Sequence, residues 1–226
     1  MRKLLKHSLL AASIAVITAT AAAQTVPVVG LVELSGAGAT AGTNFNNGMR
    51  LAVKEINAQG GLGGRPIEYS SSDTQTNPGT AKALAAKAID QNAYLVIGPV
   101  FSGSILVSMT ETRRAEVPNI IGGEAAAITQ QGNPYVFRCS FTQAAAMPKV
   151  ARYLKDSVKA KTIAVVYVNN DFGKGGRDAI LKDLEAVGIK VVADISTDPG
   201  QIDFSGPVLK VKQSNARPRA IRAAAR

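Results

Sequence analysis

Two serines, Ser102 and Ser104, lie in the segment GPVFSGS (98–104), where an apolar stretch ends and a helical pattern begins. Serine hydroxyls and unpaired backbone N–H groups converge at the start of a helix, and such a position binds carboxylates. The chemistry that this segment offers is therefore hydrogen bonding to an anionic group of a ligand. The alternative is that both serines only cap the helix.

Histidine and cysteine, which carry much of enzyme chemistry, are nearly absent. His7 is the only histidine and Cys139 the only cysteine. Because His7 lies within a predicted signal peptide, the mature chain has no Ser-His-Asp or Cys-His mechanism and lacks the commonest metal ligand. A single cysteine forms no intrachain disulfide. We therefore expect no catalytic residue, no metal site and no cofactor.

The positive charge of the chain is concentrated at its two ends. The formal net charge is +10, but seven of the cations lie in the first six and the last ten residues. The rest of the chain is only mildly basic, and aromatic residues make up 5% of the sequence. A nucleic-acid surface combines basic residues with aromatic ones, so no nucleic-acid partner is expected.

The N-terminus has the pattern of a cleaved signal peptide. Arg2, Lys3 and Lys6 precede an uncharged stretch at 9–23 that ends in small residues of the kind that signal peptidase reads. This stretch is shorter than the roughly 20 apolar residues that span a membrane. We expect residues 1–23 to be removed and the protein to be exported in soluble form, without a lipid anchor because no cysteine follows the cut.

Strand-like and helical patterns alternate along the rest of the chain. This alternation predicts an α/β fold in which mainly parallel sheets are covered by helices on both faces. We expect strands at 26–33, 65–71, 94–97, 117–121, 135–138, 162–168 and 189–194, and helices at 43–59, from 77 onward, at 104–114, around 147–154 and at 172–187. The helix at 43–59 carries an apolar stripe of Phe45, Met49, Ala52, Val53 and Ile56.

Two glycine-rich segments are expected to have structural roles. A phosphate-binding glycine loop follows a strand and opens a helix. Gly60 and Gly61 instead follow a predicted helix, where glycine supplies a left-handed C-cap. The segment GKGGRD (173–178) does follow a strand, but it lacks the glycine spacing of the dinucleotide fingerprint.

Three strand ends carry residues that suit a ligand site. In open α/β sheets, ligands bind beyond the carboxyl ends of the strands. The segments at these ends are LSGAGATAG (34–42), GPVFSGS (98–104) and IGGEAAAIT (121–129). We expect the ligand site along this edge.

Four segments match one protein family in order and spacing. They are LAVKEINAQGGLGGRPIEYSSSDTQTNPGTA (51–81), YLVIGPVFSG (94–103), NPYVFR (133–138) and VVYVNNDFGKGGRDAI (165–180). Together they resemble the leucine/isoleucine/valine-binding proteins that feed ABC importers. The resemblance spans about 26–205 and implies a two-lobed type I periplasmic-binding fold, with a crossing between the lobes near 139–143. It also implies an amino acid or similar small polar solute trapped by lobe closure, a membrane permease as partner, and a periplasmic monomer.

The resemblance assigns ligand contacts to a few residues. Ser102 matches a serine whose hydroxyl bonds the ligand carboxylate, and the segment 122–125 matches one that supplies backbone and small hydroxyl contacts. Phe172 matches an aromatic residue of the second lobe that covers the ligand, with ordinary packing at a helix start as the alternative. The predicted ligand-binding residues are Ser102, Gly122, Gly123, Ala125 and Phe172.

Two residues depart from the family pattern. Ala41 stands where family members often carry an aromatic ring, which implies a larger or more polar side-chain pocket. Glu124 stands in the second ligand loop, where small neutral residues are usual. Glu124 either holds a ligand amine, points to solvent, or indicates a solute other than a branched-chain amino acid, and we favour solvent.

The resemblance also divides the chain into a signal peptide (1–23), a first lobe (24–141), a partial second lobe (142–216) and an Arg/Ala tail (217–226). After residue 216 the family continues with a buried strand, whereas this chain reads RPRAIRAAAR. We interpret this difference as a truncation or frameshift, with a genuine short variant as the alternative. Because the family's ammonium-binding acid falls beyond residue 226, we expect the chain as it stands to bind its solute poorly.

Three classes of function are compatible with an exported α/β chain. The first is the solute-binding component of an ABC importer, the second a ligand-sensing receptor of the same fold for an amide, urea or an amino acid, and the third an α/β enzyme. Export argues against a cytoplasmic sensor. The missing histidines and the missing dinucleotide fingerprint argue against an enzyme. The sequence thus predicts a periplasmic solute-binding protein.

Overall fold

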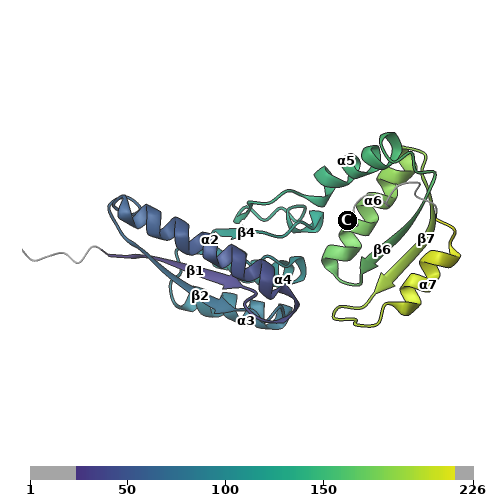
Figure 1. The fold of residues 1–226 in the computed structure, drawn as a ribbon. Helices are drawn as coiled ribbons and strands as arrows, with labels where there is room; N and C mark the ends of the chain where they lie inside the picture. Colours follow the sequence, from purple (N-terminus) through teal and green to yellow (C-terminus); the bar gives the residue numbers. More distant parts are fainter. Residues whose placement is uncertain (1–23, 217–226) are drawn as a thin grey trace, which may run out of the picture.

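The computed structural model describes residues 24–216. These residues form an α/β structure with two lobes, each built on its own parallel sheet and flanked by helices (Figure 1). The predicted α/β two-lobed fold is therefore confirmed. The predicted signal peptide at 1–23 and the Arg/Ala tail at 217–226 lie outside the described residues.

The strands and helices alternate as the sequence pattern predicts. The strands are β1 (Val26–Val32), β2 (Ile67–Asp73), β3 (Leu95–Ile97), β4 (Asn119–Ile121), β5 (Val136–Arg138), β6 (Thr162–Val168) and β7 (Lys190–Thr197). The α-helices are α2 (Ala39–Ala58), α3 (Pro78–Asp90), α4 (Ser102–Arg114), α5 (Gln143–Asp156), α6 (Asp171–Ala186) and α7 (Ser205–Gln213), with short 3₁₀ turns η1 (Gly36–Gly38) and η2 (Ala126–Ile128).

The first sheet has the strand order β2-β1-β3-β4-β5, and all of its pairs are parallel. Strand β1 lies in the interior of the sheet and pairs with β2 along its whole length, from Val26 opposite Ile67 to Val32 opposite Asp73. An interior parallel strand is covered on both faces, which explains the nearly unbroken apolar run of β1. Helices α2, α3 and α4 make the crossovers between these strands.

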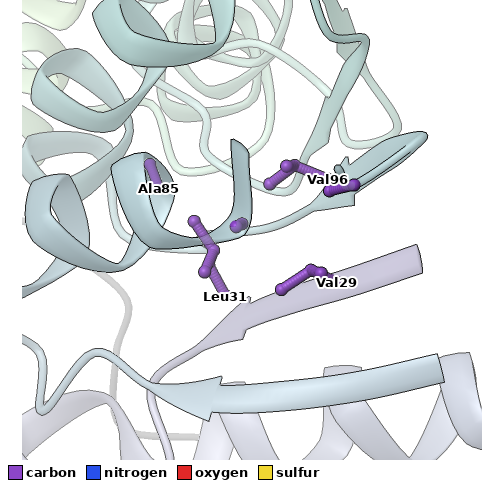
Figure 2. Packing of buried hydrophobic residues seen from close by; sticks show 6 residues of the cluster. Val29, Leu31, Ala85 and Val96 are labelled. Atoms are coloured by element: carbon purple, nitrogen blue, oxygen red, sulfur yellow. The ribbon is translucent and has the colours of Figure 1, made fainter. Parts of the chain in front are cut away.

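The two faces of the first sheet are covered differently. Val29 and Leu31 of β1 pack with Val96 of β3 and with Ala85 of α3, and all four side chains are buried (Figure 2). On the opposite face, Tyr69 of β2 donates a hydrogen bond of 2.7 Å to the side chain of Asn46 in α2. The first lobe is therefore a three-layer structure that holds the strand ends at one edge.

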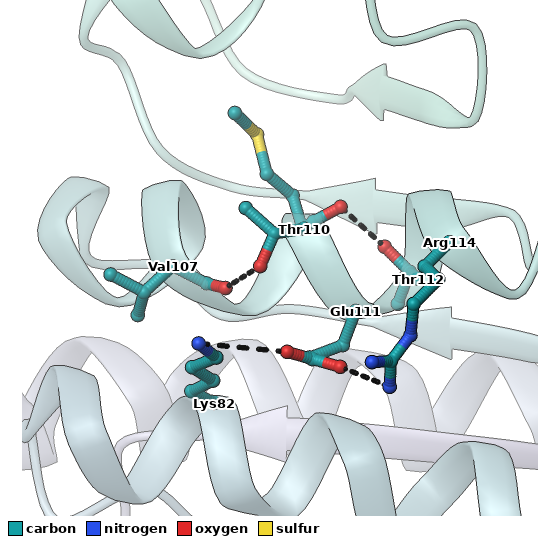
Figure 3. Close-up of polar contacts among 7 residues, drawn as sticks. Lys82, Val107, Thr110, Glu111, Thr112 and Arg114 are labelled. Atoms are coloured by element: carbon teal, nitrogen blue, oxygen red, sulfur yellow. Dashed lines mark hydrogen bonds and ion pairs between the residues drawn. The ribbon is translucent and has the colours of Figure 1, made fainter.

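Helices α3 and α4 pack closely because their shared face carries small residues. Ala81 and Ala85 of α3 are buried, as are Ser104 and Ser108 of α4. At the surface of this pair, Glu111 lies 3.7 Å from Lys82 of α3 and 2.7 Å from Arg114 of its own helix (Figure 3). Exposed ion pairs of this kind contribute little, so the close helix packing is what fixes the position of α4.

Figure 3 also shows two threonines of α4 whose hydroxyls bond the helix's own backbone. Thr110 donates to the carbonyl of Val107 at 2.7 Å, and Thr112 donates to the carbonyl of Met109 at 3.2 Å. These short-range bonds satisfy hydroxyls inside the helix. Both threonines therefore use their hydroxyl protons within the helix.

The expected core face of the helix at 43–59 is partly wrong. Helix α2 begins at Ala39 and buries Gly42, Asn46 and Met49. Ile56, expected in the apolar stripe, is 39% exposed. The helix is rotated in this way because Gly42 lies against the backbone of Glu33, where a Cβ would be 2.1 Å from the Glu33 carbonyl oxygen.

The glycine-rich loop after α2 turns the chain, as expected. The N–H of Gly60 donates to the carbonyl of Asn57 at 3.1 Å, and the N–H of Gly61 donates to the carbonyl of Ile56 at 2.9 Å. Both glycines have positive φ, 101° and 78°. This bond pattern is a Schellman cap, which glycine favours because it has no Cβ.

The second sheet contains β6 and β7, which run parallel. Helices α5 and α6 cover it, and their core consists of the buried side chains Ala151, Ala160, Leu184 and Ile189. Strand β6 has the bounds that the sequence pattern predicts. The second lobe thereby places the start of α6 beside the first lobe (Figure 1).

Candidate functional site

Three loops of the first lobe meet at one edge of its sheet. Strands β1, β3 and β4 are parallel neighbours, so the segments after them begin side by side. These segments start at Glu33, Gly98 and Gly122. They are the three strand ends where the sequence predicts the ligand site.

The first loop is held by the carboxylate of Asp73 at the end of β2. This carboxylate accepts hydrogen bonds from the N–H of Leu34 at 2.9 Å, from the N–H of Ser35 at 3.1 Å and from the hydroxyl of Ser35 at 2.6 Å. Desolvation raises the pKa of Asp73, but the bonds from Ser35, Gln75 and Leu34 outweigh it and hold the pKa below its ordinary value. Asp73 therefore fixes the direction in which the chain leaves β1.

The second loop is held by Glu33, which is fully buried. Its two carboxylate oxygens accept hydrogen bonds from the N–H groups of Val100, at 3.2 Å, and Phe101, at 3.1 Å. Burial raises the pKa of Glu33, and these backbone bonds only partly oppose the shift. An internal carboxylate thus occupies the N–H groups immediately before α4, and a ligand is left with those of the helix's first turn.

Gly98 lets this second loop pass close to strand β1. Its φ is 94°, and a Cβ on it would lie 2.0 Å from the carbonyl oxygen of Leu31. Only glycine tolerates both conditions. The start of α4 is therefore placed by a backbone-to-backbone approach that no side chain could replace.

Ser102 connects the second loop with the third. It is the first residue of α4, is 2% exposed, and its hydroxyl oxygen accepts a hydrogen bond of 3.3 Å from the N–H of Ala125. The N-cap of α4 is Phe101, and no side chain caps this helix end. The alternative that Ser102 and Ser104 merely cap the helix is therefore wrong. The hydroxyl proton of Ser102 has no acceptor among the described residues and can be donated.

The third loop is held by Arg138 at the end of β5. Its guanidinium donates to the carbonyl of Gly123, to the carbonyl of Ala125 at 2.9 Å and to the hydroxyl of Thr129 at 3.2 Å. Gly123 is buried so deeply that a Cβ would lie 2.3 Å from the Ile105 side chain. Arg138 thus holds the loop through three hydrogen bonds, and the backbone carbonyls of Gly123 and Ala125 face inward, toward the guanidinium.

The predicted backbone contacts of the third loop are largely used inside the protein. The N–H of Gly122 donates to Pro99 at 3.2 Å, and both backbone groups of Ala125 are paired as described above. The N–H groups of Gly123 and Glu124 take part in none of these bonds. If this loop binds a ligand through its backbone, those two donors are the ones available.

Glu124 is half-buried, although we expected it to point to solvent. Burial raises its pKa, and the positive charge of Arg138 opposes that rise. Its carbonyl oxygen accepts a bond of 3.0 Å from the N–H of Gln143. Glu124 therefore lies on a loop whose backbone is fixed on both sides.

Phe172 is the second residue of α6 and is 44% exposed. Helix α6 begins at Asp171 because Asn170 caps it: the Asn170 side chain accepts a hydrogen bond of 2.9 Å from the N–H of Gly173. A hollow of about 270 Å³ beside Phe172 is lined by residues of the second lobe, Gln143 among them, and by no residue of the three first-lobe loops. Phe172 is thus exposed beside the first lobe but encloses no cavity with Ser102.

The start of α6 lies against the first lobe at two points. A Cβ on Gly103 of α4 would lie 3.0 Å from the carboxylate of Asp171, and one on Gly175 of α6 would lie 3.7 Å from the side chain of Ala125. Ser102 is next to Gly103 in the chain and Phe172 is next to Asp171, so the start of α4, Ala125 and the start of α6 lie close together. Gly122 lies farther back, where a Cβ would meet Val100 and Phe45 of the first lobe.

The residues that hold the loops were not identified from the sequence. They are Glu33, Asp73, Arg138 and Gln143. Two of them could have been noticed in the sequence. Glu33 and Asp73 are acidic residues at or just after the ends of predicted strands, close to segments that we expected to bind the ligand. The partners that the four residues hold in the three loops and in α6 are 9 to 68 residues away in sequence, which no local pattern reveals.

Within residues 24–216 there is no group of three or more histidine, cysteine or acidic side chains that could hold a metal ion. In the same part of the chain, no helix is long and apolar enough to cross a membrane.

The fold is that of solute-binding proteins, and residues 25–218 match the family described as periplasmic binding protein. This match covers most of the chain, so the chain belongs to the periplasmic binding protein family. The resemblance to leucine/isoleucine/valine-binding proteins is confirmed as well. The family consists of solute-binding proteins rather than enzymes.

Two curated relatives illustrate the similarity. The chain is 30% identical over 186 residues to the Leu/Ile/Val-binding protein BraC3 of Rhizobium johnstonii, covering 81% of this chain and 51% of that protein. It is 29% identical over 184 residues to an amino acid binding protein of Pseudomonas aeruginosa, covering 80% and 49%. The chain spans about half the length of these relatives.

Solved structures agree with the sequence relatives. The substrate-binding protein LivJ of Streptococcus pneumoniae, in complex with isoleucine, has a TM-score of 0.75 and 28% identity, over 84% of this chain and 54% of that one. A solute-binding protein of Rhodopseudomonas palustris, in complex with 4-hydroxybenzoate, has a TM-score of 0.76 and 26% identity, over 85% and 52%. These two similar structures hold a branched-chain amino acid and an aromatic acid.

Proposed function

We propose that this chain is a periplasmic solute-binding component of an ABC importer. It is exported by a signal peptide at 1–23, binds a small solute between a first lobe (24–141) and a second lobe (142–216), and delivers it as a monomer to a membrane permease. The observation that carries the proposal is the free hydroxyl donor of Ser102, held at the edge where α4, the third loop and α6 meet. Family membership supports the same reading.

The solute that this site suits is a small carboxylic acid. The Ser102 hydroxyl, the N–H groups of Gly123 and Glu124 and the first turn of α4 are all hydrogen-bond donors, and donors at a helix start favour an anion. Phe172 supplies a partly exposed ring on the opposite side. Ser102, Gly122, Gly123, Ala125 and Phe172 remain our proposed contact residues, with Gly122 and Ala125, whose N–H groups are bonded inside the protein, acting more as supports than as open contacts.

The mechanism is binding without bond chemistry. A solute held by the first lobe stabilises the closed arrangement when it also contacts the second lobe, because only differential affinity shifts the balance between open and closed states. The contact between Asp171 and Gly103 shows that α6 reaches α4 directly. A permease that recognises the closed form would then receive only loaded protein.

Two classes of solute are candidates for this site. A branched-chain amino acid fits the relatives named as Leu/Ile/Val binders. A benzoate-type acid is favoured by similar structures that hold 4-hydroxybenzoate or benzoate. Both present a carboxylate to the same donors, and they differ in whether an ammonium group must also be bound.

The test is a titration of the purified chain with L-leucine, L-isoleucine, L-valine, 4-hydroxybenzoate and benzoate. Chemical-shift titration by NMR covers millimolar constants and therefore also weak binding. Saturable shifts at residues 102 and 122–126 with one solute class support the proposal and identify the class. If none of the five solutes causes saturable shifts, the proposed function is contradicted for these solutes. If saturable shifts appear at other residues, the proposed location of the binding site is wrong.

A further inference from the structure

The first two turns of helix α6 contain three glycines, Gly173, Gly175 and Gly176. The segment lacks the glycine spacing of a dinucleotide-binding loop, so that function does not explain them. Glycine weakens a helix relative to alanine, so three of them in two turns require a packing reason. Gly173 lies against β6, where a Cβ would be 1.9 Å from the carbonyl oxygen of Val168. Gly175 and Gly176 both lie against Gln143, where a Cβ would be 2.8 Å and 3.0 Å from its side-chain amide.

Gln143 is bonded to both lobes at once. It is the first residue of α5, follows the crossing from the first lobe and is only 2% exposed. Its backbone N–H donates to the carbonyl of Glu124 at 3.0 Å. Its side-chain nitrogen donates to the carbonyl of Phe172 at 2.7 Å. One residue therefore connects the third loop of the first lobe to the aromatic residue of the second.

The orientation of the Gln143 amide is fixed by these contacts. Only its NH₂ group can donate to the Phe172 carbonyl, which leaves Oε1 on the other side. That oxygen is buried and has no hydrogen-bond partner. A buried acceptor without a partner is unfavourable, so packing alone does not account for a glutamine here, where methionine would fill the same space.

We propose that Gln143 is a positioning residue that couples the loop carrying Glu124 to Phe172. The first turn of α5 then acts as a fixed pivot between the lobes, and it sets the position of the Phe172 backbone relative to the third loop. The glycines at 175 and 176 leave room for the amide. This inference rests on the proposed function only in that the third loop and Phe172 are taken as parts of the solute site.

The test variant is Gln143→Met, which keeps side-chain length and burial but removes the donor to Phe172. Gly175→Ala is a second variant, because its Cβ displaces the amide without removing it. Gly48→Ala is the matched control, since Gly48 is also a helical glycine and a Cβ on it would meet no atom within 4 Å. The full chain is used throughout.

The first measurement is amide hydrogen exchange without ligand. Loss of one hydrogen bond changes a local opening equilibrium by roughly threefold to tenfold. In Gln143→Met and Gly175→Ala, the amide exchange rate should therefore rise by that factor in both 122–126 and 172–177. It should stay unchanged in the core strand 26–32 and in all segments of Gly48→Ala. A rise confined to 172–177, or no rise, would mean that Gln143 only fills the second lobe and would overturn the proposal. If Gln143→Met fails to fold, Gly175→Ala decides by the same criterion.

The second measurement is affinity for L-isoleucine and 4-hydroxybenzoate. Gln143→Met should weaken whichever of the two binds by roughly threefold to tenfold. Unchanged affinity, with faster exchange in both segments, would contradict the claim that the coupling serves binding. If the wild-type chain binds neither probe, the proposed function fails for these solutes, and hydrogen exchange alone decides whether Gln143 couples the lobes.

Discussion

The hydroxyl oxygen of Ser102 accepts a hydrogen bond from the backbone N–H of Ala125 at 3.3 Å. This bond joins the first turn of α4 to the loop after β4, two segments that are 23 residues apart in sequence. Because the oxygen is used as an acceptor, the hydroxyl proton is the group that remains for a ligand. Four predictions follow from this site and its supports.

Ser102→Ala should weaken carboxylate binding by roughly tenfold or more, because a hydrogen bond to a charged group contributes about 1.5–3 kcal/mol. NMR titration with the best solute measures the change. Ser104→Ala is the control: Ser104 lies on the same helix and is equally buried, but on the face that packs against α3 rather than beside the third loop, so binding should stay the same. Equal losses in both variants would remove Ser102 from the site.

Glu33 should make the protein less stable as pH rises. Its pKa is raised by burial in the folded chain, so the folded state binds more protons than the unfolded state at pH values between the ordinary 4.5 and the raised value. Unfolding free energy then falls with rising pH through that window. Urea unfolding of wild type and Glu33→Gln across pH measures it, and the variant should lose this slope. A parallel pH dependence in the two proteins would contradict the assignment.

Asp73 should give the opposite dependence. Hydrogen bonds from Ser35, Gln75 and Leu34 outweigh desolvation and lower its pKa in the folded chain, so its contribution is present above the ordinary value of 3.8 and is lost as pH falls through the lowered one. Asp73→Asn should remove that loss and should also loosen the first loop. Urea unfolding at low pH, with wild type in parallel, provides the comparison. The idea fails if the variant is as acid-sensitive as wild type.

Phe172→Ala should reduce affinity more than stability. The ring is 44% exposed, so its truncation should cost less than the about 3–5 kcal/mol typical of a core phenylalanine. Calorimetry gives the stability and NMR titration the affinity. Phe137→Ala is the control, since Phe137 is also exposed (54%) but lies on strand β5 of the first sheet. A core-sized stability loss in Phe172→Ala would favour ordinary packing.

The sequence predicted the local structure well where short-range physics decides it. Asn77 caps α3 by accepting a 3.0 Å bond from the N–H of Thr80, with Pro78 in the first helical position. Gly60 and Gly61 end α2 with the expected cap. Caps and glycine turns depend on residues within a few positions of one another, so their signals are complete in the sequence.

Helix starts that depend on distant contacts were predicted less well. Helix α4 begins at Ser102 rather than Ser104, and α2 at Ala39 rather than Thr43. The start of α2 is set by the approach of Gly42 to Glu33, and the turn before α4 by the carboxylate of Glu33. A propensity pattern contains neither contact, so it placed both starts too late.

For the candidate site, the sequence by itself determined that the three strand ends share one edge, because order along a parallel sheet is enough to place them. Ser102 and Phe172 stay predicted contacts that the family resemblance supplies. Only the tertiary structure decided which donors of those loops are free. Arg138 uses the carbonyls of Gly123 and Ala125, and Gln143 connects Glu124 with Phe172. Buried polar groups must find partners wherever the fold brings them, and that pairing is a property of the packed chain.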